Sequence, residues 1–274
     1  MPRPTISIIT PSFNQGRFIE QTIQSVLDQK GEFELEYVVI DGGSTDCTVD
    51  ILKRYEDRLE WVSEKDDGQV DAINKGFKRV RGDIVAFINS DDVYLPGALA
   101  KVVDAFERSP SAPWLHSKSR IVDEEGKTVR EWISSYKHRR CERYSFASLL
   151  TEDYIHQPGA FWRRSAREAI GLMDPASQLA FDYDWFLRLA KLGPPVYVSE
   201  PLGCVRWYPS TKSGGQYAQQ LRDALAIARR HDPGSAWRDL VRRYRLFRIL
   251  VAYRLMEFFR RSKRAELEPT QTDG

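Results

Sequence analysis

One short apolar segment limits most strongly what this chain can fold into. Residues 84–88 read Ile-Val-Ala-Phe-Ile and are followed at once by Asn89, Ser90, Asp91 and Asp92. An apolar run of this length between polar residues is typical of a strand buried on both faces of a sheet. Ligands of open α/β sheets bind beyond the carboxyl ends of the strands, and carboxylates there suit a hard divalent cation that in turn holds phosphates.

The two adjacent carboxylates have a second interpretation. Asp91 or Asp92 could be the N-cap of a helix that starts near Pro96, because a carboxylate at a cap accepts hydrogen bonds from the free N–H groups of the first turn. The pattern in the rest of the chain has to decide between a cap and a ligand site.

Strand-like and helix-like segments alternate through the first hundred residues. Strands are expected at 5–10, 37–40, 59–63 and 84–88, and helices at 18–29, 48–55 and 70–79. This alternation predicts βαβ units, and therefore an α/β fold with a Rossmann-like, mostly parallel central sheet flanked by helices.

Each expected strand ends in a polar turn. The turns are 11–12, 41–44, 64–69 and 89–92. Because the carboxyl ends of parallel strands meet at one edge of a sheet, these turns should gather there. Asp41 is suited to hydrogen-bonding a base or ribose, and equally to an Asx turn within its own loop. Asp71 lies at a helix start, so it could be a cap, and no turn has the spacing of a phosphate-binding loop.

Charge is distributed unevenly along the 274 residues. The net charge is only +2, with 42% hydrophobic and 29% charged residues, which favours a globular protein and no nucleic-acid partner. Residues 216–274 contain 13 Lys and Arg against 7 Asp and Glu, whereas residues 1–215 contain 28 against 32. We therefore expect a main domain over 1–215 and a basic helical C-terminal extension over 216–274.

The cysteines and the hydropathy pattern bear on location. Cys47, Cys141 and Cys204 are far apart and suggest neither a metal site nor a disulfide framework, which fits a reducing cytosol. No signal peptide is recognisable, and no stretch approaches the ~20 apolar residues that span a bilayer. The expected location is cytoplasmic, including peripheral contact with the inner face of the plasma membrane.

Four motifs occur in order along the first half of the chain. They are residues 11–14 (Pro-Ser-Phe-Asn), 39–46 (Val-Ile-Asp-Gly-Gly-Ser-Thr-Asp), 67–76 (Asp-Gly-Gln-Val-Asp-Ala-Ile-Asn-Lys-Gly) and 89–92 (Asn-Ser-Asp-Asp). Together they resemble the nucleotide-sugar-binding half of family 2 glycosyltransferases, which are inverting enzymes with a glycosyltransferase-A fold. The resemblance is strong over residues 5–100 and weaker to about 213. It implies a donor-binding half at 1–100 and an acceptor half at 101–215.

The resemblance implies roles for individual residues of these motifs. The nucleotide sugar would be bound by Pro11, Ser12, Phe13, Asp41, Gly68, Asp71, Asn89 and Ser90. The fourth motif is usually Asp-x-Asp, and here Asn89 replaces its first Asp. Asp91 is left as the direct ligand of a divalent cation, Mn²⁺ or Mg²⁺. The loss of one carboxylate should weaken metal affinity, and diphosphate oxygens would complete the coordination.

Residues 205–213 resemble a loop that closes over the donor diphosphate. Arg206 and Lys212 could neutralise the diphosphate, or could be solvated loop charges. Tyr208 stands where many relatives have a histidine that ligates the metal. A phenol with a pKa near ~10 is a poor ligand for Mg²⁺ or Mn²⁺ at neutral pH.

The acceptor half carries the implied catalytic base. The family typically has Glu-Asp at a helix start, and here Phe181 replaces the Glu while Asp182 takes the place of the base. Asp182 could also be the N-cap of that helix, and Asp184 points to another helix face and is the weaker candidate. His156 could be catalytic, a metal ligand or a packed structural residue, and the structural interpretation is favoured.

Residues 236–264 predict a long helix with an apolar stripe interrupted by arginines. A basic amphipathic helix can lie on an anionic membrane surface, or it can pack on the domain with its arginines outward.

The leading hypothesis from the sequence is an inverting glycosyltransferase. It would move a sugar from a nucleotide-diphosphate sugar, UDP-linked by family frequency, to a hydroxyl of a glycan or lipid-linked acceptor in surface polysaccharide synthesis. The alternatives are a sugar-phosphate nucleotidyltransferase and a degenerate nucleotide-binding scaffold.

Overall fold

The structure, a computed structural model, describes residues 3–209, 211 and 215–267, with side chains as far as residue 251. In chain order the elements are β1 (Thr5–Ser12), α1 (Ile19–Leu27), β2 (Glu34–Asp41), α2 (Thr48–Lys53), β3 (Glu60–Ser63), α3 (Gln69–Arg79), β4 (Ile84–Phe87), β5 (Val93–Tyr94), α4 (Ala98–Arg108), β6 (Trp114–Val122), α5 (Glu131–Glu142), α6 (Phe146–Leu149), the 3₁₀ turn η1 (Gln157–Gly159), β7 (Ala160–Arg163), α7 (Arg164–Ile170), α8 (Phe181–Leu192), β8 (Val196–Arg206), α10 (Tyr217–His231) and α11 (Ala236–Leu267).

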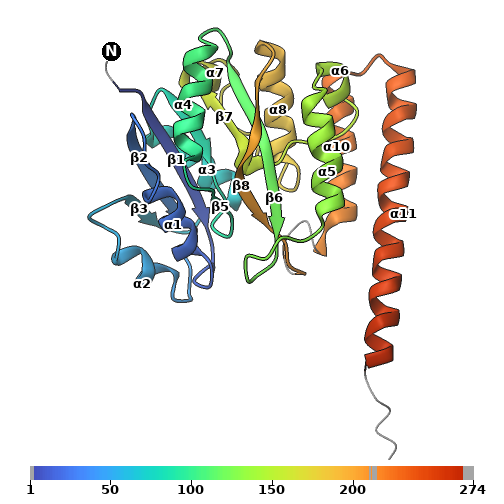
Figure 1. Cartoon of the computed structure of the whole chain (residues 1–274), viewed down its shortest axis with the longest axis horizontal. Helices are drawn as coiled ribbons and strands as arrows, with labels where there is room; N and C mark the ends of the chain where they lie inside the picture. Colours follow the sequence, from blue (N-terminus) through green and yellow to red (C-terminus); the bar gives the residue numbers. More distant parts are fainter. Residues whose placement is uncertain (1–2, 210, 212–214, 268–274) are drawn as a thin grey trace, which may run out of the picture.

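The described strands form one sheet in the order β3-β2-β1-β4-β7-β6-β8-β5 (Figure 1). β3, β2, β1 and β4 pair in parallel, and so do β6 and β8. β7 is antiparallel to both of its neighbours, and β5 is antiparallel to β8. The expected α/β fold is confirmed, and the sheet is mixed because β5 and β7 run against the other strands.

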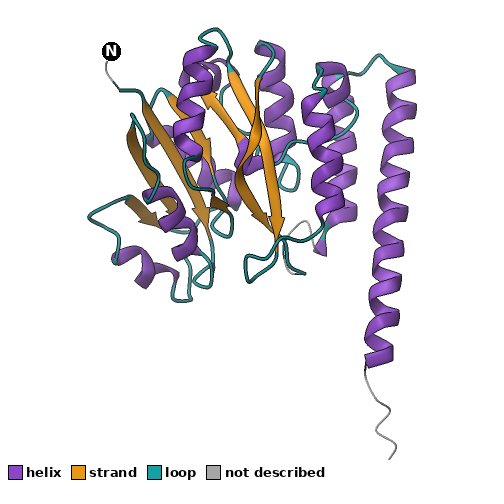
Figure 2. Cartoon of the chain, viewed as in Figure 1, coloured by secondary structure: helices purple, strands orange, loops and turns teal. Residues whose placement is uncertain are grey.

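Helices cover both faces of this sheet (Figure 2), and β4 shows why the strands read as continuous apolar runs. Ile84 and Ala86 point into a core shared with α1 and α4, whereas Val85 and Phe87 point into a second core shared with α3 and α8. Successive side chains of a strand face opposite sides of the sheet, so a strand covered on both sides must be apolar at every position. Burial of each large side chain contributes about 1.5–3 kcal/mol.

One glycine sets how closely α3 lies on the sheet. A Cβ atom at Gly76 would lie 2.5 Å from Cγ2 of Ile9 in β1, so a larger residue would push the helix away. This close packing places the first turn of α3 directly beside the carboxyl ends of the strands.

The structure corrects the cap interpretations. The N-cap of α4 is Gly97, without a side-chain cap hydrogen bond, so the interpretation of Asp91 or Asp92 as its cap is wrong. The N-cap of α8 is Ala180, so Asp182 lies inside the first turn and does not cap it. Asp71 likewise lies within the first turn of α3, whose N-cap is Gly68.

The two C-terminal helices differ in how they join the domain. α10 is part of the core, because Ile227 and Ala228 pack in the same cluster as α8. α11 lies beside α10 at the edge of the molecule and runs past it (Figure 1). The boundary at 215/216 stays a prediction. Within the described residues, no helix is both long enough and apolar enough to cross a membrane.

Candidate active site

Three strand ends align in one row at the carboxyl edge of the sheet. Ser12 of β1 pairs with Asp41 of β2, and Asp41 pairs with Ser63 of β3. The row is closed by backbone hydrogen bonds of 2.8 Å from Gly42 N to Ser12 O and 3.0 Å from Glu64 N to Asp41 O. The structure therefore brings together polar turns that are distributed over residues 12–63 of the sequence.

Asp41 is fully buried and its carboxylate is saturated with donors. Oδ2 accepts from the backbone N–H groups of Gly43 and Ser44 at 3.2 and 2.9 Å and from the Ser63 hydroxyl at 2.7 Å. Oδ1 accepts from the Ser44 hydroxyl. This is the Asx turn that the sequence allowed, so Asp41 shapes the loop. Its contact with a nucleotide stays a prediction.

Beside Asp41, the end of β1 leaves one polar atom without a protein partner. The hydroxyl of Ser12 is buried and accepts or donates no hydrogen bond within the described residues. Pro11 is buried next to it, whereas the ring of Phe13 is 58% exposed. A buried hydroxyl without a partner is costly, and an exposed aromatic ring next to it offers a stacking surface, so both features suit a planar ligand with polar edges.

The start of α3 adds a second carboxylate to this edge. Gly68, with φ of +103°, turns the chain into the helix and donates its N–H to Oδ1 of Asp66 at 2.9 Å. Asp66 also lies against Gly42, and burial raises the pKa of its carboxyl. Asp71 forms an ion pair with Lys75 at 3.2 Å. The sequence prediction did not select Asp66, although it directly precedes the third motif.

Asn89 is held from both sides by side chains. Its Oδ1 accepts from Nε2 of Gln69 at 2.6 Å, and its Nδ2 donates to Oδ2 of Asp92 at 3.0 Å. The other oxygen of Asp92 accepts from the backbone N–H of Arg206 at 2.8 Å. Ser90, which follows Asn89 in the motif, is buried. Asp92 therefore orients Asn89, and the second carboxylate of the motif has a structural role.

Asp91 is the less buried member of the pair. Its Oδ2 accepts a hydrogen bond of 3.0 Å from the hydroxyl of Tyr208. Burial raises the pKa of Asp91, and the Tyr208 hydrogen bond and the charge of Arg206 offset this only in part. No cluster of three or more metal-ligating side chains occurs among the described residues. A single carboxylate with amide and hydroxyl oxygens nearby fits a cation of the Mg²⁺ or Mn²⁺ type, which takes its other ligands from phosphates and water.

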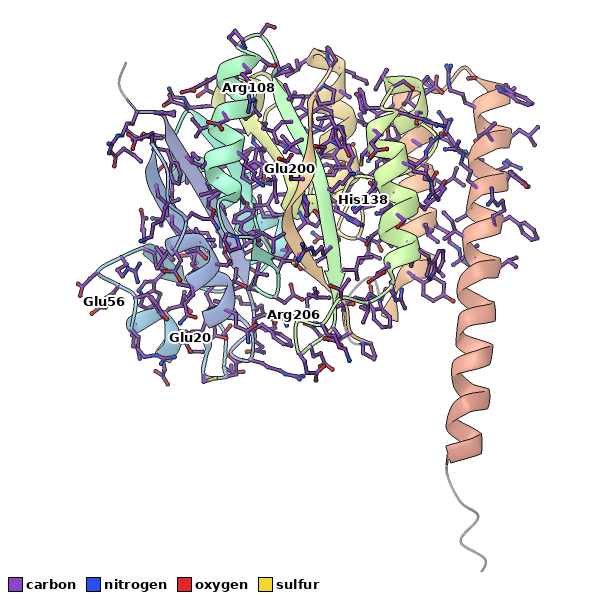
Figure 3. All side chains as sticks on the ribbon, in the orientation of Figure 1. Glu20, Glu56, Arg108, His138, Glu200 and Arg206 are labelled. Carbon is purple, nitrogen blue, oxygen red and sulfur yellow. The ribbon has the colours of Figure 1, made fainter. Side chains whose placement is uncertain are left out.

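Arg206, at the end of β8 (Figure 3), is only 4% exposed. Its guanidinium braces the loops around Asp91. It donates to the backbone oxygens of Asp91 at 2.8 Å and Glu124 at 2.7 Å, and to Oε1 of Gln21 at 2.8 Å. A direct contact between Arg206 and a diphosphate stays a prediction. The guanidinium would have to give up some of these hydrogen bonds in order to bind a phosphate oxygen. Lys212, the other predicted cation, lies outside the described residues.

Asp182 is brought to the same edge by the residue before it. The ring of Phe181 packs against Phe87, the last residue of β4, with 5.8 Å between ring centroids. Asp182 follows in the first turn of α8, where its Oδ1 accepts from the N–H of Tyr183 at 2.9 Å. The hydrophobic contact explains why a phenylalanine can stand where the family pattern has a glutamate. Asp184, by contrast, is buried in an ion pair with Arg188 at 3.0 Å.

His156 has the properties of a packed structural histidine. It is 8% exposed, and burial holds the pKa of its imidazole well below the usual value.

A comparison with protein families identifies the fold and the motifs together. The profile described as "Glycosyl transferase family 2" matches residues 7–171, which is more than half of the chain. The chain belongs to glycosyltransferase family 2. The matched region contains all four sequence motifs, most of β1 and the strands from β2 to β7, so the edge described above lies within the family 2 domain.

Curated relatives of this family 2 domain share about 30% of its residues. A glycosyltransferase of Mycobacterium tuberculosis is 30% identical over 198 residues, which cover 71% of this chain and 72% of the relative. A glycosyltransferase of Nostoc sp. is 30% identical over 62% of this chain and 54% of its own length. Chondroitin synthase of Escherichia coli is 28% identical over 72% of this chain. The chain thus spans about half of the Nostoc protein and 28% of the synthase.

Solved structures share the fold at lower identity. TarS of S. aureus, residues 1–349 in complex with UDP-GlcNAc, superimposes with a TM-score of 0.61 at 17% identity, over 87% of this chain and 70% of that one. A mannosyltransferase of Pyrobaculum calidifontis, in complex with GDP-Man and Mn²⁺, gives a TM-score of 0.64 at 20% identity, over 83% of this chain and 65% of that one. At this identity the likeness establishes the glycosyltransferase-A fold.

Proposed function

We propose that this family 2 domain is an inverting glycosyltransferase that uses a nucleotide-diphosphate sugar, with UDP as the nucleotide. The observation that carries the proposal is the row of polar strand ends at Ser12 and Asp41, with Asp91 following β4 at the same edge of the sheet. Asp182 is added because its neighbour Phe181 packs on Phe87, the last residue of β4. The unpartnered hydroxyl of Ser12 and the exposed ring of Phe13 support a base-binding site there. The complexes of TarS with UDP-GlcNAc and of the Pyrobaculum enzyme with GDP-Man support the class of donor.

The proposed reaction is a single displacement at the anomeric carbon. Asp182 takes the proton of the acceptor hydroxyl while the oxygen of that hydroxyl attacks the anomeric carbon. The bond from the anomeric carbon to the diphosphate breaks, and the nucleoside diphosphate leaves with its electrons. Asp91 and Asn89 would hold a divalent cation, which when bound stabilises the negative charge of the leaving diphosphate. Gln69 and Asp92 keep Asn89 in place for this role.

The proposed acceptor is a hydroxyl of a glycan or of a lipid-linked glycan in surface polysaccharide synthesis. One support is a Bacillus subtilis relative, 41% identical over 112 residues, whose name assigns it to teichuronic acid biosynthesis. The second support is an apolar stripe along the outer side of α11. Its members are Trp237 (72% exposed), Leu240 (59%), Tyr244 (59%), Phe247 (64%) and Val251 (37%).

We propose that this stripe rests on an anionic membrane surface at the cytoplasmic side. Arg243 and Arg248 are exposed on either side of the stripe by helical geometry, and Arg243 also forms an ion pair of 3.0 Å with Asp239 one turn earlier. Cationic residues beside exposed apolar ones fit anionic lipid head groups.

Calorimetric titration with UDP, dTDP and GDP, each with and without Mn²⁺, tests the donor site. We expect UDP to bind best and only with Mn²⁺. Asp91→Asn should weaken that binding by about tenfold or more, because it removes the charged ligand of the cation. Asp104→Asn, an exposed position in α4, is the control and should leave binding unchanged. A UDP affinity that is the same with and without Mn²⁺, and the same in Asp91→Asn as in the wild type, would contradict the metal role. Absence of binding by all three nucleotides would contradict the proposed function.

Asp182→Asn tests the base. The variant should bind UDP as the wild type does, because Asp182 is assigned to the acceptor side. Release of UDP from UDP-GlcNAc should fall by about 10²–10⁴-fold, the usual contribution of a general base. Unchanged turnover in this variant would show that Asp182 is not the base.

A further inference from the structure

The carboxyl end of β8 brings Tyr208 against Asp91. Arg206, the last residue of β8, pairs with Val122 of β6, and the N–H of Trp207 donates to the backbone oxygen of Val122 at 2.8 Å. Tyr208 follows, and its hydroxyl donates to Oδ2 of Asp91 at 3.0 Å. Two side chains that are 117 residues apart in sequence therefore meet at the edge of the sheet.

Tyr208 is held in place by contacts other than this hydrogen bond. Its ring packs on Phe18, the N-cap residue of α1, with 5.2 Å between ring centroids, and Phe18 is itself buried. The backbone oxygen of Tyr208 accepts from the N–H and the hydroxyl of Thr211 at 3.1 and 2.8 Å. Ring and backbone are thus fixed independently of Asp91, so the hydroxyl reaches the carboxylate from a defined position.

The direction of the hydrogen bond follows from the chemistry of the two groups. A phenol, whose pKa is ordinarily near ~10, keeps its proton at neutral pH, so Tyr208 donates and Asp91 accepts. A hydrogen bond to a carboxylate is stronger than one between neutral groups, so it fixes the side-chain torsions of Asp91. A carboxylate can accept about four hydrogen bonds, and one donor leaves capacity for a cation.

The orientation of Asp91 matters because few charges are available to hold a cation here. Asn89 is neutral, and both oxygens of Asp92 are used, by Nδ2 of Asn89 and by the N–H of Arg206. No cluster of three or more metal-ligating side chains occurs in the part of the chain that the structure describes. When one carboxylate supplies the charge, ordering that side chain in advance removes an entropic cost from metal binding.

We propose that Tyr208 is a positioning residue of the cation site, whose hydroxyl holds the carboxylate of Asp91 in the orientation that a divalent cation requires. The inference rests on the proposed function, because it takes Asp91 as the charged ligand. Tyr208 acts through Asp91 and is not itself a ligand. Asn89 is supported in the same way by Gln69 and Asp92, so each of the two groups assigned to the cation has its own hydrogen-bonded support.

Binding of Mn²⁺ to the full chain, measured by EPR without any nucleotide, tests the proposal. Tyr208→Phe keeps the ring on Phe18 and removes only the hydroxyl. We expect the affinity for Mn²⁺ to fall by about tenfold or more, the usual effect of losing a hydrogen-bond partner of a metal ligand. Unchanged affinity would overturn the proposal. Tighter binding would overturn it as well, because it would mean that the hydroxyl competes with the cation for Asp91.

A double-mutant cycle shows whether Tyr208 acts through Asp91. Asp91→Asn should weaken Mn²⁺ binding on its own, and adding Tyr208→Phe should then cost nothing further, because the oriented carboxylate is already gone. A general structural defect would instead weaken binding by the same factor in both backgrounds, and that result would overturn the proposal.

Tyr55→Phe is the matched control. It removes another tyrosine–carboxylate hydrogen bond of 3.0 Å, between the hydroxyl of Tyr55 and Oε1 of Glu20 in α1. This variant should bind Mn²⁺ as the wild type does. Equal losses of Mn²⁺ affinity in Tyr55→Phe and Tyr208→Phe would overturn the specific role of Tyr208.

Failure of this inference can be distinguished from failure of the proposed function. If Mn²⁺ binding depends on Tyr208 and Asp91 as expected but UDP, dTDP and GDP do not bind, the cation site stands and the proposed donor is contradicted. If a nucleotide binds but the wild type takes up no Mn²⁺, the role of Tyr208 is overturned and the donor site stands.

Discussion

Several carboxylates of this chain differ in role because their partners differ, although their sequence contexts are alike. Asp91 and Asp92 are adjacent, yet Asp92 accepts hydrogen bonds from Asn89 and from a backbone N–H, whereas Asp91 accepts one from Tyr208. A carboxylate that is already saturated holds the fold, and one that keeps an oxygen for a ligand can take part in chemistry.

His116 illustrates the reverse case, a buried titratable group whose ring nitrogens have no hydrogen-bond partner in the part of the chain that the structure describes. It is fully buried in β6, and burial lowers its pKa from 6.5 to about 3. The unfolded chain therefore binds the proton first as pH falls. The stability that the neutral imidazole contributes is complete above about pH 6.5 and is lost progressively towards pH 3.

We expect His116→Phe to make the free energy of unfolding depend less on pH. The ring of Phe keeps the contacts with Trp114 and Tyr197, whose centroids lie 5.8 and 5.4 Å away, and it has no proton to gain. Urea denaturation at pH 7.5 and at pH 5 should show a smaller loss of unfolding free energy in the variant, by up to about 1.4 kcal/mol per pH unit. Equal losses in the two proteins would contradict the prediction.

At the scale of elements, the donor half was predictable and the acceptor half was not. The parallel strands β1, β2 and β4 are buried on both faces over most of their length, so they read as apolar runs. All four strands from β1 to β4 begin and end within three residues of the expected positions. β6 contains Ser117 and Ser119 and pairs irregularly with β8, which hides its strand pattern. α5 buries only Ser134 and Cys141 and so lacks an apolar face to recognise.

Long-range bracing is what local sequence cannot reveal. The sequence placed Arg206 near the site, but its acceptor Gln21 lies 185 residues away in α1. The segment that leads to Asp182 is likewise positioned by a residue far along the chain, Asn74 of α3. The identity of the site residues followed from motifs, whereas their orientation followed from contacts between elements.

Asn74 of α3 is the clearest such brace. Its amide donates to the backbone oxygen of Met173 at 3.0 Å and accepts from the N–H of Met173 at 2.9 Å, so it ties α3 to the segment that leads into α8. Asn74→Ala would leave both backbone groups buried without partners. We expect a loss of about 2–4 kcal/mol in unfolding free energy, measured by urea denaturation.

The control for this substitution is Gln24→Ala. Gln24 is exposed in α1 and its amide bonds to the hydroxyl of Tyr55, so its loss should change stability by less than about 0.5 kcal/mol. Comparable stability of Asn74→Ala and Gln24→Ala would show that the Asn74 bridge does not join the two halves.

At the scale of the whole molecule, α11 has two sides with different tasks. Arg242 and Arg245 face inward and hold the segment between α6 and η1 through the Leu150 carbonyl and the Glu152 carboxylate. The stripe from Trp237 to Val251 faces outward. If the outer side rests on a membrane, the inner side fixes the acceptor half of the site relative to that surface. A lipid-linked acceptor would then meet the base in a defined orientation.

The double variant Leu240→Ser/Phe247→Ser tests this arrangement. Both side chains are more than half exposed, at 59% and 64%, so the fold should be unaffected. We expect the wild type to float with phosphatidylglycerol-containing vesicles and less so in high salt, because salt screens the arginines. Each large side chain contributes about 1.5–3 kcal/mol when buried, so the variant should bind vesicles at least about a hundredfold more weakly.

The control for the stripe is Leu172→Ser, an exposed leucine before α8 that lies outside it and is 40% exposed. This variant should bind vesicles as the wild type does. Light scattering without lipid tests whether the stripe instead pairs with a second copy of the chain. That pairing would be indicated if the wild type is dimeric, the double variant is monomeric and neither binds vesicles. Equal vesicle binding by the wild type and the double variant would contradict membrane contact through α11, and the orientation argued for a lipid-linked acceptor would fail with it.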